Sequence, residues 1–222
     1  MSSADATEEK LLARLRALDS CALSDALDRL GCPPSVSGIE PRTKAQRIAG
    51  RVLTVRLAAG SGGSARHLCT TAIEAAKPGD VIVVEQRTGI DAAGWGGILS
   101  RAAQARGLSG VIVEGPARDI DEATQIGFPV YARGVTPRTA RGRIHEAATG
   151  EPIHVGEGIV AAGDYVLADA SGVVFLPATQ VGEIITAAEQ IAARERAMTA
   201  DLESGKPVSS VMGASYESML KR

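Results

Sequence analysis

Two short stretches of the chain hold residue types that could do chemistry together. One is GWGGIL at residues 94–99, and the other is Arg118-Asp119, which follows the apolar run GVIVE at 110–114. A glycine-rich turn that opens a helix leaves N–H groups unpaired at the positive end of the helix, which suits a carboxylate. Arg offers a planar fork to a carboxylate or an enolate oxygen, and Asp offers a hard oxygen ligand to Mg²⁺ or Mn²⁺. Together they indicate a site for an anion and a divalent metal.

Each feature also has a structural interpretation that the residues alone leave open. Glycine-rich turns open many helices, and neighbouring Arg and Asp in a loop commonly form a surface ion pair worth ~0–1 kcal/mol. Asp121 fits the first turn of a helix, where its charge complements the helix dipole. Alone, each feature favours a structural role. When the turn and the Arg-Asp pair are taken together, a functional site becomes an equally good interpretation.

The elements that would position these residues alternate between strand and helix. The β-branched runs VIVVE (81–85) and GVIVE (110–114) predict strands covered on both faces. Helices are predicted over 98–106 and 120–126, and a further strand at 129–133. Because ligands gather beyond the carboxyl ends of parallel strands, the turn and the Arg-Asp pair should face one another on one side of the sheet.

The rest of the chain completes an α/β pattern without internal repeats or linkers. Residues 8–30 predict two helices broken near Asp19-Ser20, with Ser20 or Ser24 as the cap of the second and Gly31 at its end. The other predicted elements are a strand at 48–58, a helix at 64–80, short strands within 142–147, 152–156, 158–169 and 172–177, and a long terminal helix at 179–204. This order favours a single α/β domain with a layered sheet.

Composition excludes several classes of protein. Hydrophobic residues make up 45% and charged residues 23% of the 222 residues, as in ordinary soluble globular proteins. A net charge of −2 with interspersed signs argues against a nucleic-acid surface. No apolar run reaches the roughly 18 residues of a membrane span. Three cysteines without metal-ligand spacing, and no signal-peptide pattern, lead us to expect reduced thiols in a cytoplasmic protein.

The stretch GWGGILSRAAQARGLSGVIVEGPARDIDEATQIGFPVYARG (94–134) resembles the RraA-like family. This family includes class II aldolases for 4-hydroxy-4-methyl-2-oxoglutarate and 4-carboxy-4-hydroxy-2-oxoadipate, and the ribonuclease E inhibitor RraA. The other matching pieces, in order, are CALSDAL (21–27), AGRVLTV (49–55), KPGDVIVVE (77–85) and AAGDYVLADASGVVFLP (161–177). The likeness covers about residues 18–200.

The resemblance implies one domain over residues 1–222, with its core at 18–200 and its C-terminal helix at 179–204. The implied fold is a layered α/β arrangement similar to the swivelling phosphohistidine-type β/β/α domain. Family members assemble as homotrimers or homohexamers with active sites at subunit interfaces. The partners to be expected are therefore further copies of the chain and a small 2-oxo acid, and neither nucleic acid nor membrane.

The resemblance also implies roles for individual residues. Asp119 would bind the metal, Mg²⁺ or Mn²⁺, and Arg118 would contact the pyruvyl group of the substrate. The substrate carboxylate would be received by backbone amides of the turn, those of Gly96, Gly97, Ile98 and Leu99. The implied activity is retro-aldol cleavage of a 4-hydroxy-2-oxo acid or diacid to pyruvate through its enolate, with oxaloacetate decarboxylation as a side activity. No Schiff-base lysine is needed, and residues 78–205 contain no Lys.

The sequence departs from the aldolase pattern at one position. The aldolases carry an acidic residue twenty-one positions before the arginine, where this chain has Gly97. Glu122 or Glu85 could supply the missing acid, although each also suits a structural role. A third source is the terminal helix of a neighbouring subunit, whose acids are Glu183, Glu189 and Glu195, although a solvated helix face is the favoured interpretation there. The alternatives to this aldolase are a non-catalytic regulator like RraA and a lyase for another 2-oxo acid.

Overall fold

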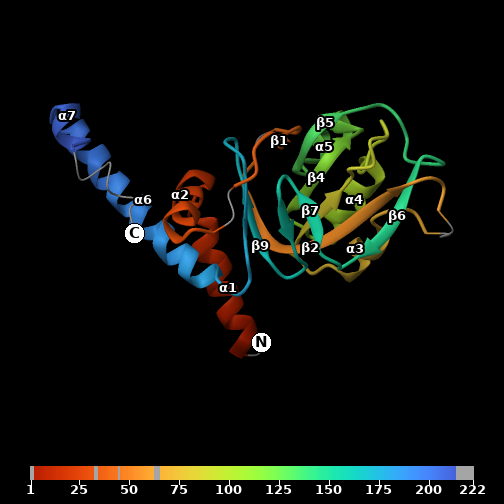
Figure 1. Ribbon diagram of the computed structural model, residues 1–222, viewed down its shortest axis with the longest axis horizontal. Helices are drawn as coiled ribbons and strands as arrows, with labels where there is room; N and C mark the ends of the chain where they lie inside the picture. The colour runs from red at the N-terminus through yellow and green to blue at the C-terminus, as the bar shows by residue number, and fades with distance from the viewer. Residues whose placement is uncertain (1–2, 33–34, 45, 63–65, 214–222) are drawn as a thin grey trace.

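The computed structural model describes residues 3–32, 35–44, 46–62 and 66–213. Figure 1 shows two neighbouring parts, a curved sheet packed with short helices and a group of helices formed by the two ends of the chain. The α/β class expected from the sequence is confirmed, since parallel strands alternate with helices in the middle of the chain.

Four parallel strands form the centre of the sheet, in the order β5-β4-β3-β2. Their bounds are β2 Ile48–Ala59, β3 Val81–Glu85, β4 Gly110–Ala117 and β5 Val130–Val135. The connections between them contain α3 Thr70–Ala75, α4 Gly97–Ala105 and α5 Ile120–Ile126. The carboxyl ends of the parallel strands therefore lie at one edge of the sheet, as the expected site requires.

Antiparallel strands complete the sheet on both sides. The short strand β1 (Glu40–Pro41) pairs with β5, and β9 (Tyr165–Ala168) pairs with β10 (Val173–Leu176). The long strand β2 pairs with β9 through its first residues and with β6 (Ile144–Thr149) through its last. A separate hairpin consists of β7 (Ile153–Val155) and β8 (Gly158–Val160).

The two faces of the sheet are buried against different partners, which explains the continuous apolar runs. Ile82 and Val84 of β3 belong to one buried cluster, which also contains Leu99 of α4 and Ile73 of α3. Val81 and Val83 belong to another cluster, with Ile153, Val155 and Val160 of the β7–β8 hairpin. Helices therefore cover one face of the parallel strands and the hairpin covers the other.

The terminal helices pack together around a third apolar cluster. They are α1 Ser3–Arg16, α2 Ser20–Leu30, α6 Val181–Glu203 and the short α7 Val208–Val211. In Figure 1, α6 extends away from the sheet. Within the described ranges, no helix is both long and apolar enough to cross a membrane.

Two local expectations at helix ends are wrong. The N-cap of α2 is Asp19, whose side chain accepts the Ala22 N–H at 2.9 Å, while the hydroxyl of Ser20 donates to Asp169 at 2.6 Å. Asp19 comes one residue earlier and has the extended backbone that a cap needs. The helix expected over 64–80 is only Thr70–Ala75, because Cys69 takes a left-handed conformation (φ 66°) just before it; residues 64–65 lie outside the described ranges.

A glutamate at the end of β3 and another within β4 hold the hairpin on the sheet. Glu85 and Glu114 are partners in register, so their side chains point to the same face. Glu114 is buried, forms an ion pair with Arg133 at 2.5 Å, and accepts the Gly156 N–H at 3.0 Å. Glu85 accepts the His154 N–H at 3.0 Å. Both carboxylates therefore bind backbone N–H groups in or next to β7, where their role is structural.

We predict that Glu114→Ala lowers the free energy of unfolding by about 2–3 kcal/mol, because it removes the ion pair with Nε of Arg133 and leaves the partly buried Gly156 N–H without its acceptor. Urea unfolding followed by circular dichroism measures this change. The matched control is Glu157→Ala, which removes an exposed carboxylate nearby and should change stability by less than about 0.5 kcal/mol. Equal stability of the two variants would contradict the role given to Glu114.

Candidate active site

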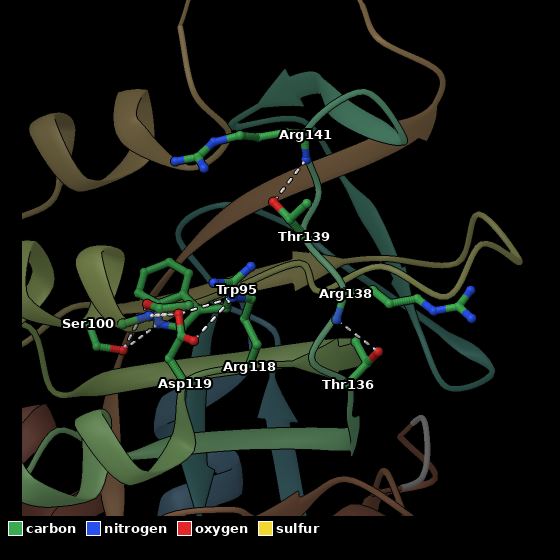
Figure 2. Close-up of polar contacts among 10 residues, drawn as sticks. Trp95, Ser100, Arg118, Asp119, Thr136, Arg138, Thr139 and Arg141 are labelled. Atoms are coloured by element: carbon green, nitrogen blue, oxygen red, sulfur yellow. Dashed lines mark hydrogen bonds and ion pairs between the residues drawn. The ribbon is translucent and has the colours of Figure 1, made fainter.

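The structure brings the glycine-rich turn and the Arg-Asp pair into direct contact. The strand β4 runs to Ala117, further than the sequence indicates, so Arg118 and Asp119 follow it directly. The N–H of Gly97, the first residue of α4, donates to Oδ2 of Asp119 at 2.9 Å. The N–H of Arg118 donates to the carbonyl of Trp95 at 3.0 Å. Figure 2 shows Trp95, Arg118 and Asp119 together.

Asp119 has a strained backbone conformation. Its φ of 58° and ψ of 39° lie in the left-handed region, which among the described non-glycine residues only Cys69 shares. Such a conformation costs on the order of 1 kcal/mol and is found where surrounding contacts hold it, often at functional sites. Here the bond from Gly97 is one such contact, and the conformation lets the chain turn from β4 into α5 while the carboxylate stays beside α4.

Arg118 contacts Asp119 through a single nitrogen. Its Nε lies 3.2 Å from Oδ1 and 3.1 Å from Oδ2 of the carboxylate. Within the described part of the chain, its two terminal amino groups have no acceptor. Both side chains are about one-third exposed. The pair is therefore partly open to solvent, and the free end of the guanidinium can bind an incoming oxygen anion.

Buried contacts fix the start of α4. Trp95 is 1% exposed, lies parallel to Phe128 with ring centroids 6.3 Å apart, and donates from Nε1 to the Ser100 hydroxyl at 2.9 Å. The same hydroxyl donates to the carbonyl of Gly96 at 3.2 Å. This network ties the turn before α4 to the first turn of the helix, so the N-terminal N–H groups have fixed positions.

The N–H groups of this first turn have different partners. The one on Gly97 is taken by Asp119, whereas those on Ile98 and Leu99 have no acceptor among the described residues. Gly96, Gly97, Ile98 and Leu99 all border one cavity together with Arg118 and Asp119. Of the four amides expected to bind a carboxylate, one is therefore already used inside the protein, and the pair on Ile98 and Leu99 fits an external anion.

Gly97 leaves space that Glu122 fills. A Cβ on Gly97 would collide with the Glu122 carboxylate. Glu122 lies in the first turn of α5 and forms an ion pair with Nε of Arg101 on α4. It is therefore next to the cavity wall formed by Gly97, although it does not itself border the cavity. Asp121, also in the first turn of α5, has the helix-start position expected of it.

A second wall of the cavity contains residues that the sequence interpretation missed. The cavity has a volume of about 70 Å³, and its other lining residues include His67, Thr139 and Arg141. Burial lowers the pKa of His67 below its ordinary value, and the charge of Arg141 lowers it further. One signal was present in the sequence: TPRTARGR (136–143) places three arginines just after β5, at the same edge of the sheet as the Arg-Asp pair.

The other acidic candidates lie elsewhere. Glu85 does not border the cavity, because its carboxylate binds the His154 N–H on the hairpin side of the sheet. On α6, Glu189 forms an ion pair with Arg14 at 2.7 Å. Burial raises the pKa of Glu195, and the neighbouring Asp25 raises it further. Within one copy of the chain, these residues belong to the packing of the terminal helices, which Figure 1 shows apart from α4 and α5.

Comparison with known proteins places the chain in a family. The RraA-like family model, described as Aldolase/RraA, matches residues 20–175. That range holds the parallel strands, the turn before α4 and the Arg-Asp pair. The chain belongs to the RraA-like family.

Individual relatives and one solved structure agree with this assignment. A Halalkalibacterium halodurans protein named "Putative 4-hydroxy-4-methyl-2-oxoglutarate aldolase" is 30% identical over 200 residues, which cover 86% of this chain and 90% of the relative. Protein DlpA of Legionella pneumophila is 26% identical over 90% of this chain, which spans only 32% of DlpA. The crystal structure of an uncharacterized Pseudomonas syringae protein superposes with a TM-score of 0.83 at 27% identity, covering 92% of this chain and 98% of the other.

Proposed function

We propose that the protein is a divalent-metal-dependent lyase that cleaves a 4-hydroxy-2-oxo acid by a retro-aldol reaction and releases pyruvate. The observation that carries the proposal is the cavity in which the Asp119 carboxylate, the free end of Arg118 and the free N–H groups of Ile98 and Leu99 converge. The name of the Halalkalibacterium halodurans relative, at 30% identity over most of both chains, supports an aldolase-like activity.

The donor set of the cavity fits Mg²⁺ or Mn²⁺. No group of three His, Cys, Asp or Glu side chains suited to a metal occurs among the described residues, and Asp119 is the only carboxylate among the residues that border the cavity. Magnesium commonly takes one or two protein carboxylates and completes its shell with water and substrate oxygens, which a solvent-accessible Asp119 allows. When bound, the cation would supply Lewis acidity toward the 2-oxo oxygen of the substrate.

The chain's own residues would orient the substrate and stabilise the developing charge. The N–H groups of Ile98 and Leu99 bind the carboxylate of the 2-oxo acid end. The terminal amino groups of Arg118 bind the oxygen that becomes negative as the C3–C4 bond breaks and its electrons form the enolate of pyruvate. Protonation of that enolate at C3 gives pyruvate. Oxaloacetate would give the same enolate on loss of CO₂, so decarboxylation is the expected side activity.

Glu122 is our candidate for the carboxylate that acts as the base and receives the proton of the C4 hydroxyl. Its carboxylate occupies the space beside Gly97 where the side chain of an acidic residue would begin. Glu85 is not a candidate, because its carboxylate binds the hairpin on the other face. The ion pair with Arg101 holds the Glu122 carboxylate beside the start of α4.

Self-association as a trimer or hexamer is part of the proposal. Ile98 is 76% exposed at the rim of the cavity, so its apolar side chain is accessible to a neighbouring copy of the chain. A neighbouring copy at this rim would bury Ile98 and exclude water from the cavity. The acids of α6 from that copy are then further candidates for contacts with the substrate.

We predict that Asp119→Asn lowers kcat/KM for pyruvate release by about 100-fold or more, because the amide cannot hold the cation. Asn tolerates the left-handed conformation, so the variant should fold. The assay couples pyruvate to lactate dehydrogenase, with Mg²⁺ or Mn²⁺, over a panel of 4-hydroxy-2-oxo acids and oxaloacetate. Activity should disappear with chelator and return with either metal. No activity on any substrate, or full activity in Asp119→Asn, would refute the lyase function and favour a binding role such as that of RraA.

A second prediction concerns the acid beside Gly97. Glu122→Ala should lower kcat by about 10²-fold or more with little change in KM, because proton transfer and not substrate binding is lost. Gly97→Asp combined with Glu122→Ala should recover part of that loss, because the new carboxylate then occupies the vacated space. The control is Asp121→Ala on the same helix turn, which should leave kcat within about twofold. Full activity of Glu122→Ala would exclude this residue as the base.

A further inference from the structure

We propose that Arg141 determines substrate specificity by binding the second, distal carboxylate of a 2-oxo diacid. The inference rests on the lyase function proposed above and adds which residue distinguishes a diacid from a monoacid. It arises from the second wall of the cavity, where an arginine that the sequence interpretation missed borders the same space as Arg118 and Asp119.

Among the described residues, the guanidinium of Arg141 differs from those of its neighbours in having no partner. Arg101 pairs with Glu122, Arg118 contacts Asp119, and Arg138 pairs with Asp91 at 3.3 Å. The backbone N–H of Arg141 donates to the Thr139 hydroxyl at 3.3 Å, but its guanidinium has no hydrogen bond or ion pair within the described ranges. All five guanidinium N–H groups therefore remain available at the edge of the cavity.

The direction of the side chain also separates Arg141 from Arg138. Both residues come from the segment between β5 and β6. In Figure 2 the Arg138 side chain points away from Asp119. The Arg141 side chain points in the opposite direction, toward the side of the view on which Trp95, Arg118 and Asp119 lie. Arg141 borders the cavity and Arg138 does not. The two arginines thus form a natural pair of test and control.

The charges around the cavity leave Arg141 available for a second anionic group of the ligand. The ionised side chains that border it are Arg118, Asp119 and Arg141. His67, the other titratable group there, is held toward its neutral form because burial and Arg141 lower its pKa. The carboxylate of a 2-oxo monoacid would bind at the start of α4 and leave Arg141 unmatched. A diacid places its second carboxylate where a planar guanidinium can bind it through two hydrogen bonds.

The test is isothermal titration of the full-length protein in Mg²⁺ with two non-cleavable probes, 2-oxoglutarate as the diacid and 2-oxobutyrate as the monoacid. The wild type should bind 2-oxoglutarate more tightly. Arg141→Met should weaken 2-oxoglutarate binding roughly 10–100-fold, the loss expected for charged hydrogen bonds. It should leave 2-oxobutyrate binding within about twofold. Arg138→Met should behave like the wild type, and thermal unfolding of both variants checks that they fold.

The proposal is overturned if the wild type shows no preference for the diacid. It is also overturned if Arg141→Met weakens the binding of both probes equally, or of neither probe. Pyruvate release, measured separately, distinguishes this outcome from failure of the lyase function. A diacid preference that depends on Arg141, found without pyruvate release, would refute the lyase function. It would still support the role of Arg141 in binding the second carboxylate. Pyruvate release with no effect of Arg141→Met on diacid binding would refute the role of Arg141 alone.

Discussion

The hydrogen bond from the Gly97 N–H to the Asp119 carboxylate is the interaction on which the candidate site depends. It joins the first residue of α4 to the residue that follows β4, and so connects two segments that the chain separates by a strand and a helix. The bond spans 2.9 Å and fixes one carboxylate oxygen. It also helps to hold Asp119 in a left-handed conformation that an isolated Asp would rarely adopt. The remaining carboxylate surface, Arg118 and the next two N–H groups then face one cavity.

The rest of the fold supports this bond from both sides. The stacked rings of Trp95 and Phe128, together with the Ser100 hydroxyl, fix the turn before α4. They thereby hold the Gly97 N–H, the donor of this bond, in position. On the opposite face, Glu85 and Glu114 attach the β7–β8 hairpin to β3 and β4. The charged residues between Glu114 and Glu122 thus have different roles. Glu114 holds the hairpin, Arg118 and Asp119 belong to the candidate site, and Glu122 lies beside Gly97.

Much of this arrangement follows from the sequence because it depends on local patterns. The β-branched runs predicted β3 and β4, and the rule that ligands lie beyond the carboxyl ends of parallel strands placed the turn beside the Arg-Asp pair. The parts that sequence could not predict depend on contacts between distant segments. Glu85 was a candidate because its type suits a site, but register with Glu114 turns it toward the hairpin. Arg141 and His67 reach the cavity only through the folding of the segments that follow β5 and precede α3.

The central claim is that Asp119 and the start of α4 form one site for a divalent cation and a 2-oxo acid. Oxalate, a planar dianion that resembles the enolate of pyruvate, tests this most directly in a calorimetric titration with and without Mn²⁺. We predict that oxalate binds the wild type at least about tenfold more tightly with Mn²⁺ than without it, and that Asp119→Asn abolishes this difference. Oxalate binding that is equally tight without Mn²⁺, or a metal dependence that persists in Asp119→Asn, would contradict the claim.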